Sequence, residues 1–210
     1  MKSKYHIEIT QKALRSHFSE EALEVIVKAN IRQDRLKFQF GHNYIHFDGS
    51  AFKEGFEYIA NLEKSILVNV SSNKILNARI SLGCVLHSWQ DFYSHSNYIQ
   101  LWLANHDHKP PVNIDWDDLS ILAHCDLKSG KNYGVMEFIA MVPGLSKIII
   151  PLMPEDSHAR MNMDSPEVSP HFNFVYMAAL LRSKDVVLRL LELMSKENFS
   201  PKNIGEFLGQ

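Results

Sequence analysis

Hydrophobic positions recur at helical spacing along most of this chain. Ile7, Ile9, Leu14 and Phe18 form one apolar stripe, which predicts a helix over residues 6–18. Ser19, followed by Glu20 and Glu21, has the sequence of a helix N-terminus and predicts a second helix. The same spacing predicts further helices at residues 50–68, 72–103, 170–194 and 203–208. Residues 133–150 are ambiguous, and their apolar content suits a helix over residues 133–141.

The stretches between these helices are rich in glycine, asparagine, proline or aromatic residues. Residues 36–49 predict a packed loop, and residues 151–170, with four prolines, predict a second loop. Pro143-Gly144 should interrupt the helix at 133–141, and the apolar run at 148–150 would suit a strand but has no partner strand. The pattern therefore predicts an all-α fold, a single multi-helix domain over residues 1–210 built around the long central helix.

Composition and charge limit the classes of function that this chain can have. The chain is 45% hydrophobic and 22% charged, with a net charge of -2, so no basic excess indicates an extended nucleic-acid footprint. Two cysteines are too few for a disulfide framework. No signal peptide and no transmembrane segment are visible, so we expect a soluble protein, cytoplasmic by default. The oligomeric state is left open. Eleven histidines, several beside carboxylates, favour metal chemistry.

The central helix carries a row of metal-ligand residue types. His87, Asp91 and His95 are spaced four apart, so their side chains share one helical face. Imidazole and carboxylate are ligands of zinc and similar ions. The alternative is that both histidines are hydrogen-bonded core residues and that Asp91 pairs with a basic side chain. Three ligand residues in register on a buried helix favour metal binding, because an unpaired buried carboxylate is costly.

Other segments must complete such a site, because one helix offers only part of a coordination shell. The upstream candidates are His6, Asp34 and a cluster of His42, His46 and Asp48. By contrast, residues 106–108, His-Asp-His, indicate a surface loop, and His124 and Cys125 lack ligand-spaced companions.

Four stretches resemble a known superfamily. His6-Ile-Glu-Ile-Thr-Gln-Lys-Ala-Leu, Ala29-Asn-Ile-Arg-Gln-Asp34, His46-Phe-Asp48 and Leu86-His-Ser-Trp-Gln-Asp-Phe-Tyr-Ser-His-Ser-Asn97 occur in the order seen in the zinc-dependent phospholipase C and single-strand nuclease superfamily. The central stretch is most similar to its heterokaryon-incompatibility-type branch.

This resemblance implies an all-helical fold with one to three zinc ions in a cleft. Asp34, His46, His87 and Asp91 would hold one ion, and Asp91 would bridge to a neighbouring ion bound by His6. His95 would bind another ion with ligands from the C-terminal half, for which the candidates are His158 and, more weakly, His171.

The function that this implies is zinc-dependent hydrolysis of a phosphodiester, in a phospholipid or a nucleic acid, by metal-activated water. The expected partner is thus a phosphodiester-containing substrate, and an enzyme is favoured, with Asp34 as ligand and general base and Asp91 as bridging ligand. The alternative is a non-catalytic, metal-stabilised helical domain or an interaction module with a degenerate active site.

Overall fold

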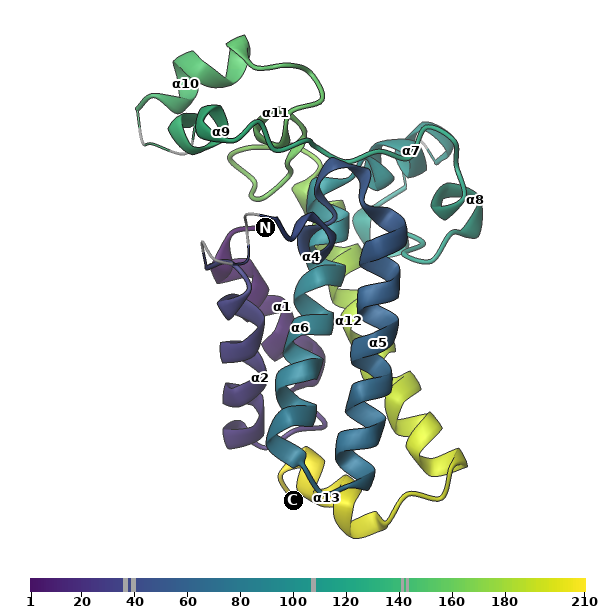
Figure 1. Cartoon of the computed structure of the whole chain (residues 1–210). Helices are drawn as coiled ribbons and strands as arrows, with labels where there is room; N and C mark the ends of the chain where they lie inside the picture. Colours follow the sequence, from purple (N-terminus) through teal and green to yellow (C-terminus); the bar gives the residue numbers. More distant parts are fainter. Residues whose placement is uncertain (36–37, 39–40, 107–108, 141, 143) are drawn as a thin grey trace.

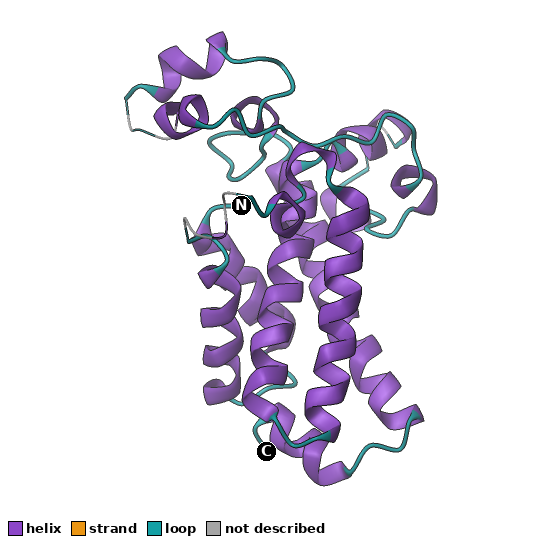
Figure 2. Ribbon diagram, in the orientation of Figure 1, coloured by secondary structure: helices purple, strands orange, loops and turns teal. Residues whose placement is uncertain are grey.

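The computed structural model describes residues 1–35, 38, 41–106, 109–140, 142 and 144–210 of the chain (Figure 1). These residues form helices and no strand, apart from two isolated bridges between single residues (Figure 2). The predicted all-α class is therefore confirmed. The longer helices are α1 (Ser3–Leu14), α2 (Glu20–Arg32), α5 (Phe52–Ser71), α6 (Ile75–His95) and α12 (Phe172–Lys196).

Helix α6 is the centre of the fold, as predicted. Every residue from Val85 to His95 is buried, because α2, α5 and α12 all pack against this helix. Figure 1 shows α6 between α2 and α5, with α1 and α12 behind them. Gly83 permits a close approach of α2, since a Cβ atom there would lie 2.7 Å from the Cβ atom of Ala29.

The central helix is shorter than predicted. It ends at His95, and a separate helix α7 (Tyr98–Asn105) follows. Ser96 adopts extended backbone angles, and its hydroxyl donates to the Phe92 carbonyl and accepts from the Tyr98 amide. Asn97 then pairs through its backbone and side chain with Lys128. These local hydrogen bonds compete with the helical ladder and place His95 at the last turn of α6.

Short helices fill the connections at both ends of the bundle. They are α4 (Asn43–His46), η1 (Asp48–Ser50), η2 (Pro111–Asn113), α8 (Leu119–Leu122), α9 (Val135–Ala140), α10 (Ser146–Ile149), η3 (Ile150–Leu152), α11 (His158–Met161) and α13 (Pro201–Leu208). The apolar run at 148–150 is thus helical, not a strand, and the described part of the predicted loop at 36–49 contains α4 and part of η1. Residues 36, 37, 39 and 40 of that loop, residues 107 and 108, and residues 141 and 143 near the predicted helix end lie outside the described residues.

The segment that contains α9, α10 and α11 covers the end of the bundle at which the chain begins (Figure 1). This end also holds α4 and the last turn of α6, so residues far apart in sequence meet there. Among the described helices, none has the length and apolar content needed to cross a membrane.

Candidate metal centre

The three predicted residues of α6 lie together on one buried face. His87 Nε2 is 3.0 Å and His95 Nε2 is 3.8 Å from the carboxylate of Asp91. Asp91 is fully buried, and the spacing of one helical turn on either side places the two imidazoles above and below it.

Asp91 is the point at which several segments of the chain converge. Its carboxylate oxygens lie 2.8 Å from the Met1 amino group, 3.2 Å from His6 Nε2 and 2.8 Å from His46 Nδ1. Burial alone would raise the pKa of Asp91, but the Met1 ammonium group and the surrounding histidines hold it well below its usual range. Asp91 is therefore a buried carboxylate anion.

A first set of metal-ligand side chains consists of His6, Asp34, His87 and Asp91, which we call set A. One nitrogen or oxygen atom of each residue lies within 4.8 Å of the others. Asp34 follows the end of α2, and its carboxylate is 3.7 Å from His87 Nε2. Set A thus joins α1, the end of α2 and the middle of α6.

Buried amide side chains orient the two imidazoles of set A. His6 Nδ1 is 2.6 Å from Gln90 Oε1, and His87 Nδ1 is 3.3 Å from Asn30 Oδ1. Because an amide oxygen only accepts, both Nδ1 atoms carry the proton, and both Nε2 atoms present a lone pair to set A. Burial lowers the pKa of His87 to about 4, so this imidazole is neutral at pH 7.

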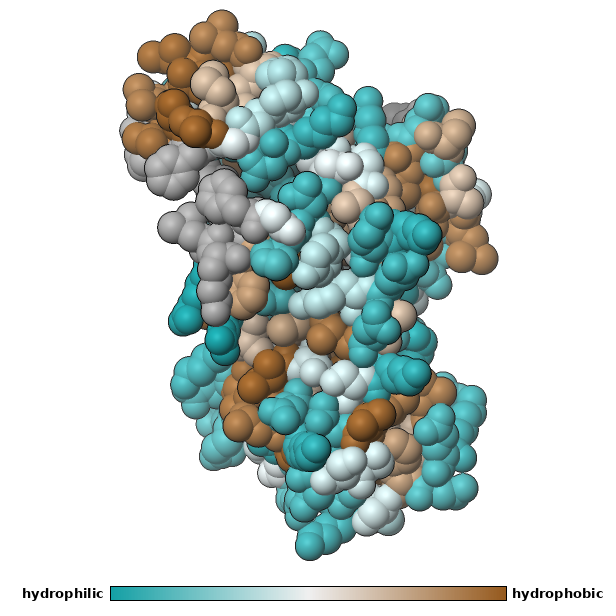
Figure 3. Space-filling view, viewed as in Figure 1, coloured by the Kyte–Doolittle hydropathy of each residue, from teal (hydrophilic) through white to brown (hydrophobic). Residues whose placement is uncertain are grey.

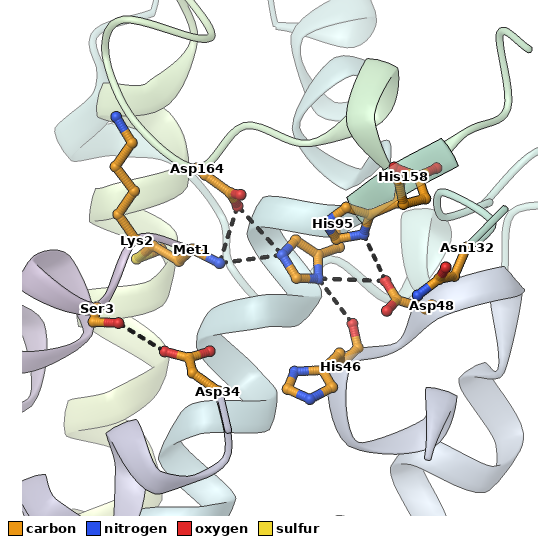
Figure 4. A pocket seen from close by; sticks show the side chains of 11 residues that line it. Met1, Lys2, Ser3, Asp34, His46, Asp48, His95, Asn132, His158 and Asp164 are labelled. Carbon is orange, nitrogen blue, oxygen red and sulfur yellow. Dashed lines mark hydrogen bonds and ion pairs between the residues drawn. The ribbon is translucent and has the colours of Figure 1, made fainter. Parts of the chain in front are cut away.

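A second set lies on the other side of Asp91 and consists of Asp48, His95 and His158, which we call set B. Atoms of these three also lie within 4.8 Å of one another. His158 Nδ1 is 2.9 Å from Asp48. Asp164 adds a fourth residue and a second carboxylate to set B, 3.2 Å from His95 Nε2 and 3.0 Å from the Met1 amino group (Figure 4).

Backbone contacts place His158 in this set. Its amide donates to the Lys131 carbonyl, and the Gly130 amide donates to the His95 carbonyl. Gly130 packs so tightly that a Cβ atom there would lie 2.5 Å from the Cα atom of His158. Burial alone would lower the pKa of His158, but the carboxylate of Asp48 raises it to about 9.

The cleft between these segments has a volume of about 400 Å³, and Figure 4 shows the side chains that line it. His6 Nε2, His46 Nε2 and Glu137 Oε1 are buried without a hydrogen-bond partner among the described residues. Each such atom costs about 1–3 kcal/mol unless it is satisfied. His46 donates from Nδ1 to Asp91 and keeps its Nε2 lone pair for the cleft, which is the usual arrangement of a zinc-bound imidazole. The side chains present therefore fit a divalent transition metal such as zinc.

Most of the predicted ligand residues meet at this centre. The structure brings together His6, Asp34, His46, His87, Asp91, His95 and His158. It does not bring in His171, which is exposed at the position before α12 and belongs to neither set. The reason is that α12 begins at Phe172, whose side chain enters the core in place of its neighbour.

The sequence pattern indicated one further carboxylate of the centre and missed two others. Asp48 belongs to the upstream cluster of candidate ligands, whereas Asp164, the first acid after His158, is not among the predicted ligands. The segment through α11 brings Asp164 back to His95, an arrangement that no helical spacing predicts. Glu137, which lines the cleft and is 3% exposed, lies in a segment without any motif.

The comparisons with known proteins point to one family. Residues 3–124 match the family model described as "VWA7 N-terminal domain". The rat protein named "von Willebrand factor A domain-containing protein 7" is 35% identical over 80 residues, and the human protein of the same name is 34% identical over 80 residues. In both cases the alignment covers 38% of this chain and 9% of the relative, so the chain spans only a small part of these relatives. No solved structure matches the chain.

These matches overturn the superfamily to which the sequence was assigned. The resemblance to the zinc-dependent phospholipase C and single-strand nuclease superfamily is wrong, because the family model and the relatives belong to a different family. The predicted zinc-dependent phosphoesterase function, and with it the phospholipase-like and nuclease-like activities, is wrong for the same reason. The short ordered motifs reflect ligand residue types, and any helical metal centre can share those types.

Proposed function

The chain belongs to the VWA7 N-terminal domain family, and from this premise we propose that it is a non-catalytic helical module whose buried histidines and carboxylates hold one or two zinc ions. All four residues of set A lie within the matched residues 3–124, whereas His158 and Asp164 of the second site lie beyond them. Set A would thus be the part of the centre that belongs to the family domain, and set B would depend on the segment that follows it.

One observation carries this proposal. His6 Nε2, which faces Asp91 in set A, is buried and has no hydrogen-bond partner among the described residues. The same is true of His46 Nε2, which lies outside both sets and belongs to a residue that lines the cleft. Gln90 and Asp91 hold the opposite nitrogens of these rings, so neither ring is free to turn and satisfy itself elsewhere. A divalent cation is the ligand that accepts several such lone pairs at once.

The role of the ion would be structural. A cation held by His6, Asp34, His87 and Asp91 would cross-link three helical segments and offset the charge of the buried carboxylates. A second cation held by Asp48, His95, His158 and Asp164 would attach the segment of α11 to the bundle. When bound, zinc would act as a Lewis acid that accepts electron pairs from the nitrogen and oxygen atoms that hold it.

The test is elemental analysis of the chain purified after zinc-supplemented expression and gel filtration in metal-free buffer. We expect about one to two equivalents of zinc per chain. A chain that is folded by circular dichroism but carries no transition metal, and takes up none on titration, would refute the proposal.

Catalysis is measured in the same preparation. We expect a chromogenic bis-phosphodiester to be hydrolysed no faster by the zinc-loaded chain than by the chelator-treated chain. Zinc-dependent turnover that disappears in Asp34→Asn, while an Asp126→Asn control keeps it, would overturn the non-catalytic part of the proposal. Asp126 serves as the control because it lies outside both sets, in a group with His124 and Cys125 whose three residues are all exposed.

A further inference from the structure

An exposed apolar surface lies at the outer end of the segment that covers the metal centre. Figure 3 shows hydrophobic side chains gathered over the region that Figure 1 labels α9 and α10. We call this surface the apolar tip and define it by exposed side chains of residues 135–152: Val135, Met136, Val142, Leu145, Ile148 and Leu152. Val135, Ile148 and Leu152 are between 63% and 74% exposed. A contiguous exposed patch of this kind marks an interaction site.

The charge of the apolar tip is small and positive. Residues 132–153 contain two charged residues, Glu137 and Lys147. Glu137 faces inward, where its carboxylate accepts from the Ala159 amide and lines the metal cleft. Lys147, on α10 between the exposed Leu145 and Ile148, is therefore the single charge that this stretch presents to solvent.

This chemistry fits a bilayer surface better than a protein partner. Protein interfaces are enriched in aromatic residues, methionine and arginine and have a polar rim. Five of the six side chains of the apolar tip are aliphatic, and the one exposed aromatic residue beside them, Tyr133, is held by a hydrogen bond to Asp156. Aliphatic side chains insert between lipid headgroups, and a lysine among them reaches back to the phosphates with its long stem. The tip also projects at the end of the molecule, beyond the long helices (Figure 1).

We propose that the apolar tip docks on the surface of membranes that contain anionic lipid, with Ile148, Leu152 and Val135 inserted and Lys147 at the headgroups. The basis is the exposure of these aliphatic side chains and the complementarity between a lone lysine and an anionic headgroup layer. The proposal is independent of metal binding, because no side chain of the tip belongs to set A or set B.

The experiment is flotation of the full chain with large unilamellar vesicles of phosphatidylcholine, with and without phosphatidylserine. We expect the chain to float with the phosphatidylserine vesicles. Ile148→Glu should weaken this partition at least about tenfold, because it removes an inserted side chain and adds a repelled charge. Lys147→Glu should weaken it by about fivefold or more on phosphatidylserine vesicles and much less on pure phosphatidylcholine.

Leu76→Glu is the matched control. Leu76 is 59% exposed, comparable to Ile148, but it lies in the first turn of α6, at the opposite end of that helix from His95. This variant should float like the unchanged chain. Zinc content is measured in every variant, and it should stay unchanged even where flotation is lost.

Three results would overturn the proposal. The first is a folded chain that floats with neither type of vesicle, and the second is equal loss of flotation in Ile148→Glu and Leu76→Glu. The third is a dimer in light scattering that Ile148→Glu dissociates, which would assign the apolar tip to a second copy of the chain.

Discussion

Replacing Asp91 with asparagine tests the metal centre at the residue on which both sets converge. The substitution keeps the size of the side chain and one carbonyl oxygen but removes the negative charge. In the structure, that charge lies within 3.2 Å of His6 Nε2 and of the Met1 amino group, and 3.0 Å from His87 Nε2. Asp91→Asn should therefore retain the fold and lose most of the affinity for zinc.

The magnitude follows from the position of the carboxylate. Removing a group that only orients a metal ligand typically costs about 10–100-fold in metal affinity. Asp91 faces set A directly and also lies 3.8 Å from His95 of set B. Asp91→Asn should therefore reduce the affinity for zinc by more than the upper end of that range, that is, by more than about 100-fold, or about 2.8 kcal/mol of binding free energy.

The assay is zinc competition against a chromogenic chelator, with circular dichroism to verify the helical content of each variant. Asp126→Asn is the matched control, because Asp126 belongs to an exposed group with His124 and Cys125 whose ligand atoms also lie within 4.8 Å of one another. The control should bind zinc like the unchanged chain. If Asp91→Asn is folded and binds zinc as tightly as the control, Asp91 is not a ligand and the centre has been misassigned.

Three further predictions concern stability. With free zinc at about 100 times its Kd, zinc binding should raise the free energy of unfolding by about 2.7 kcal/mol. EDTA should therefore lower Tm by about 5–10 °C in differential scanning fluorimetry. An unchanged Tm would argue against a structural ion. Gly83→Ala should lower the free energy of unfolding by about 1–3 kcal/mol in urea because of the tight α2–α6 contact, whereas Gly205→Ala in α13, where a Cβ atom meets nothing nearer than 3.7 Å, should not destabilise. The pKa of His158 is raised to about 9 in the folded chain. Protonated His158 should therefore stabilise the metal-free chain fully below about pH 6.5, and this stabilisation should be lost as the pH rises through 9. Asp48→Asn should remove that pH dependence of the free energy of unfolding, and an identical dependence in the variant would contradict the pairing of Asp48 with His158.

Some of the centre was predictable because it depends on local periodicity. An α-helix repeats every 3.6 residues, so His87, Asp91 and His95 had to share a face wherever α6 packs. The apolar positions on all sides of this stretch also indicated that the face would be buried. The same local rules predicted the helices that carry His6 and that precede Asp34.

Family and function were not predictable in this way. Histidine and aspartate at helical spacing indicate that a metal can be held, but they do not distinguish one helical metal-binding family from another. The matched family overturned the assignment that these short motifs favoured. Fold class survived that correction because it depends on the whole hydrophobic pattern and not on a few ligand residues.

The sequence by itself determined the helices and the row of ligands on α6, since both follow from short-range backbone geometry. Only the tertiary structure decided which distant residues complete the centre. Asp164 pairs with His95, and Asp48 pairs with His158, because loops bring them together. These loops are held by hydrogen bonds between residues far apart in sequence, such as the one that the Gly130 amide donates to the His95 carbonyl. The long connections after α7 have no periodic pattern, so their course depends on the surfaces that they meet.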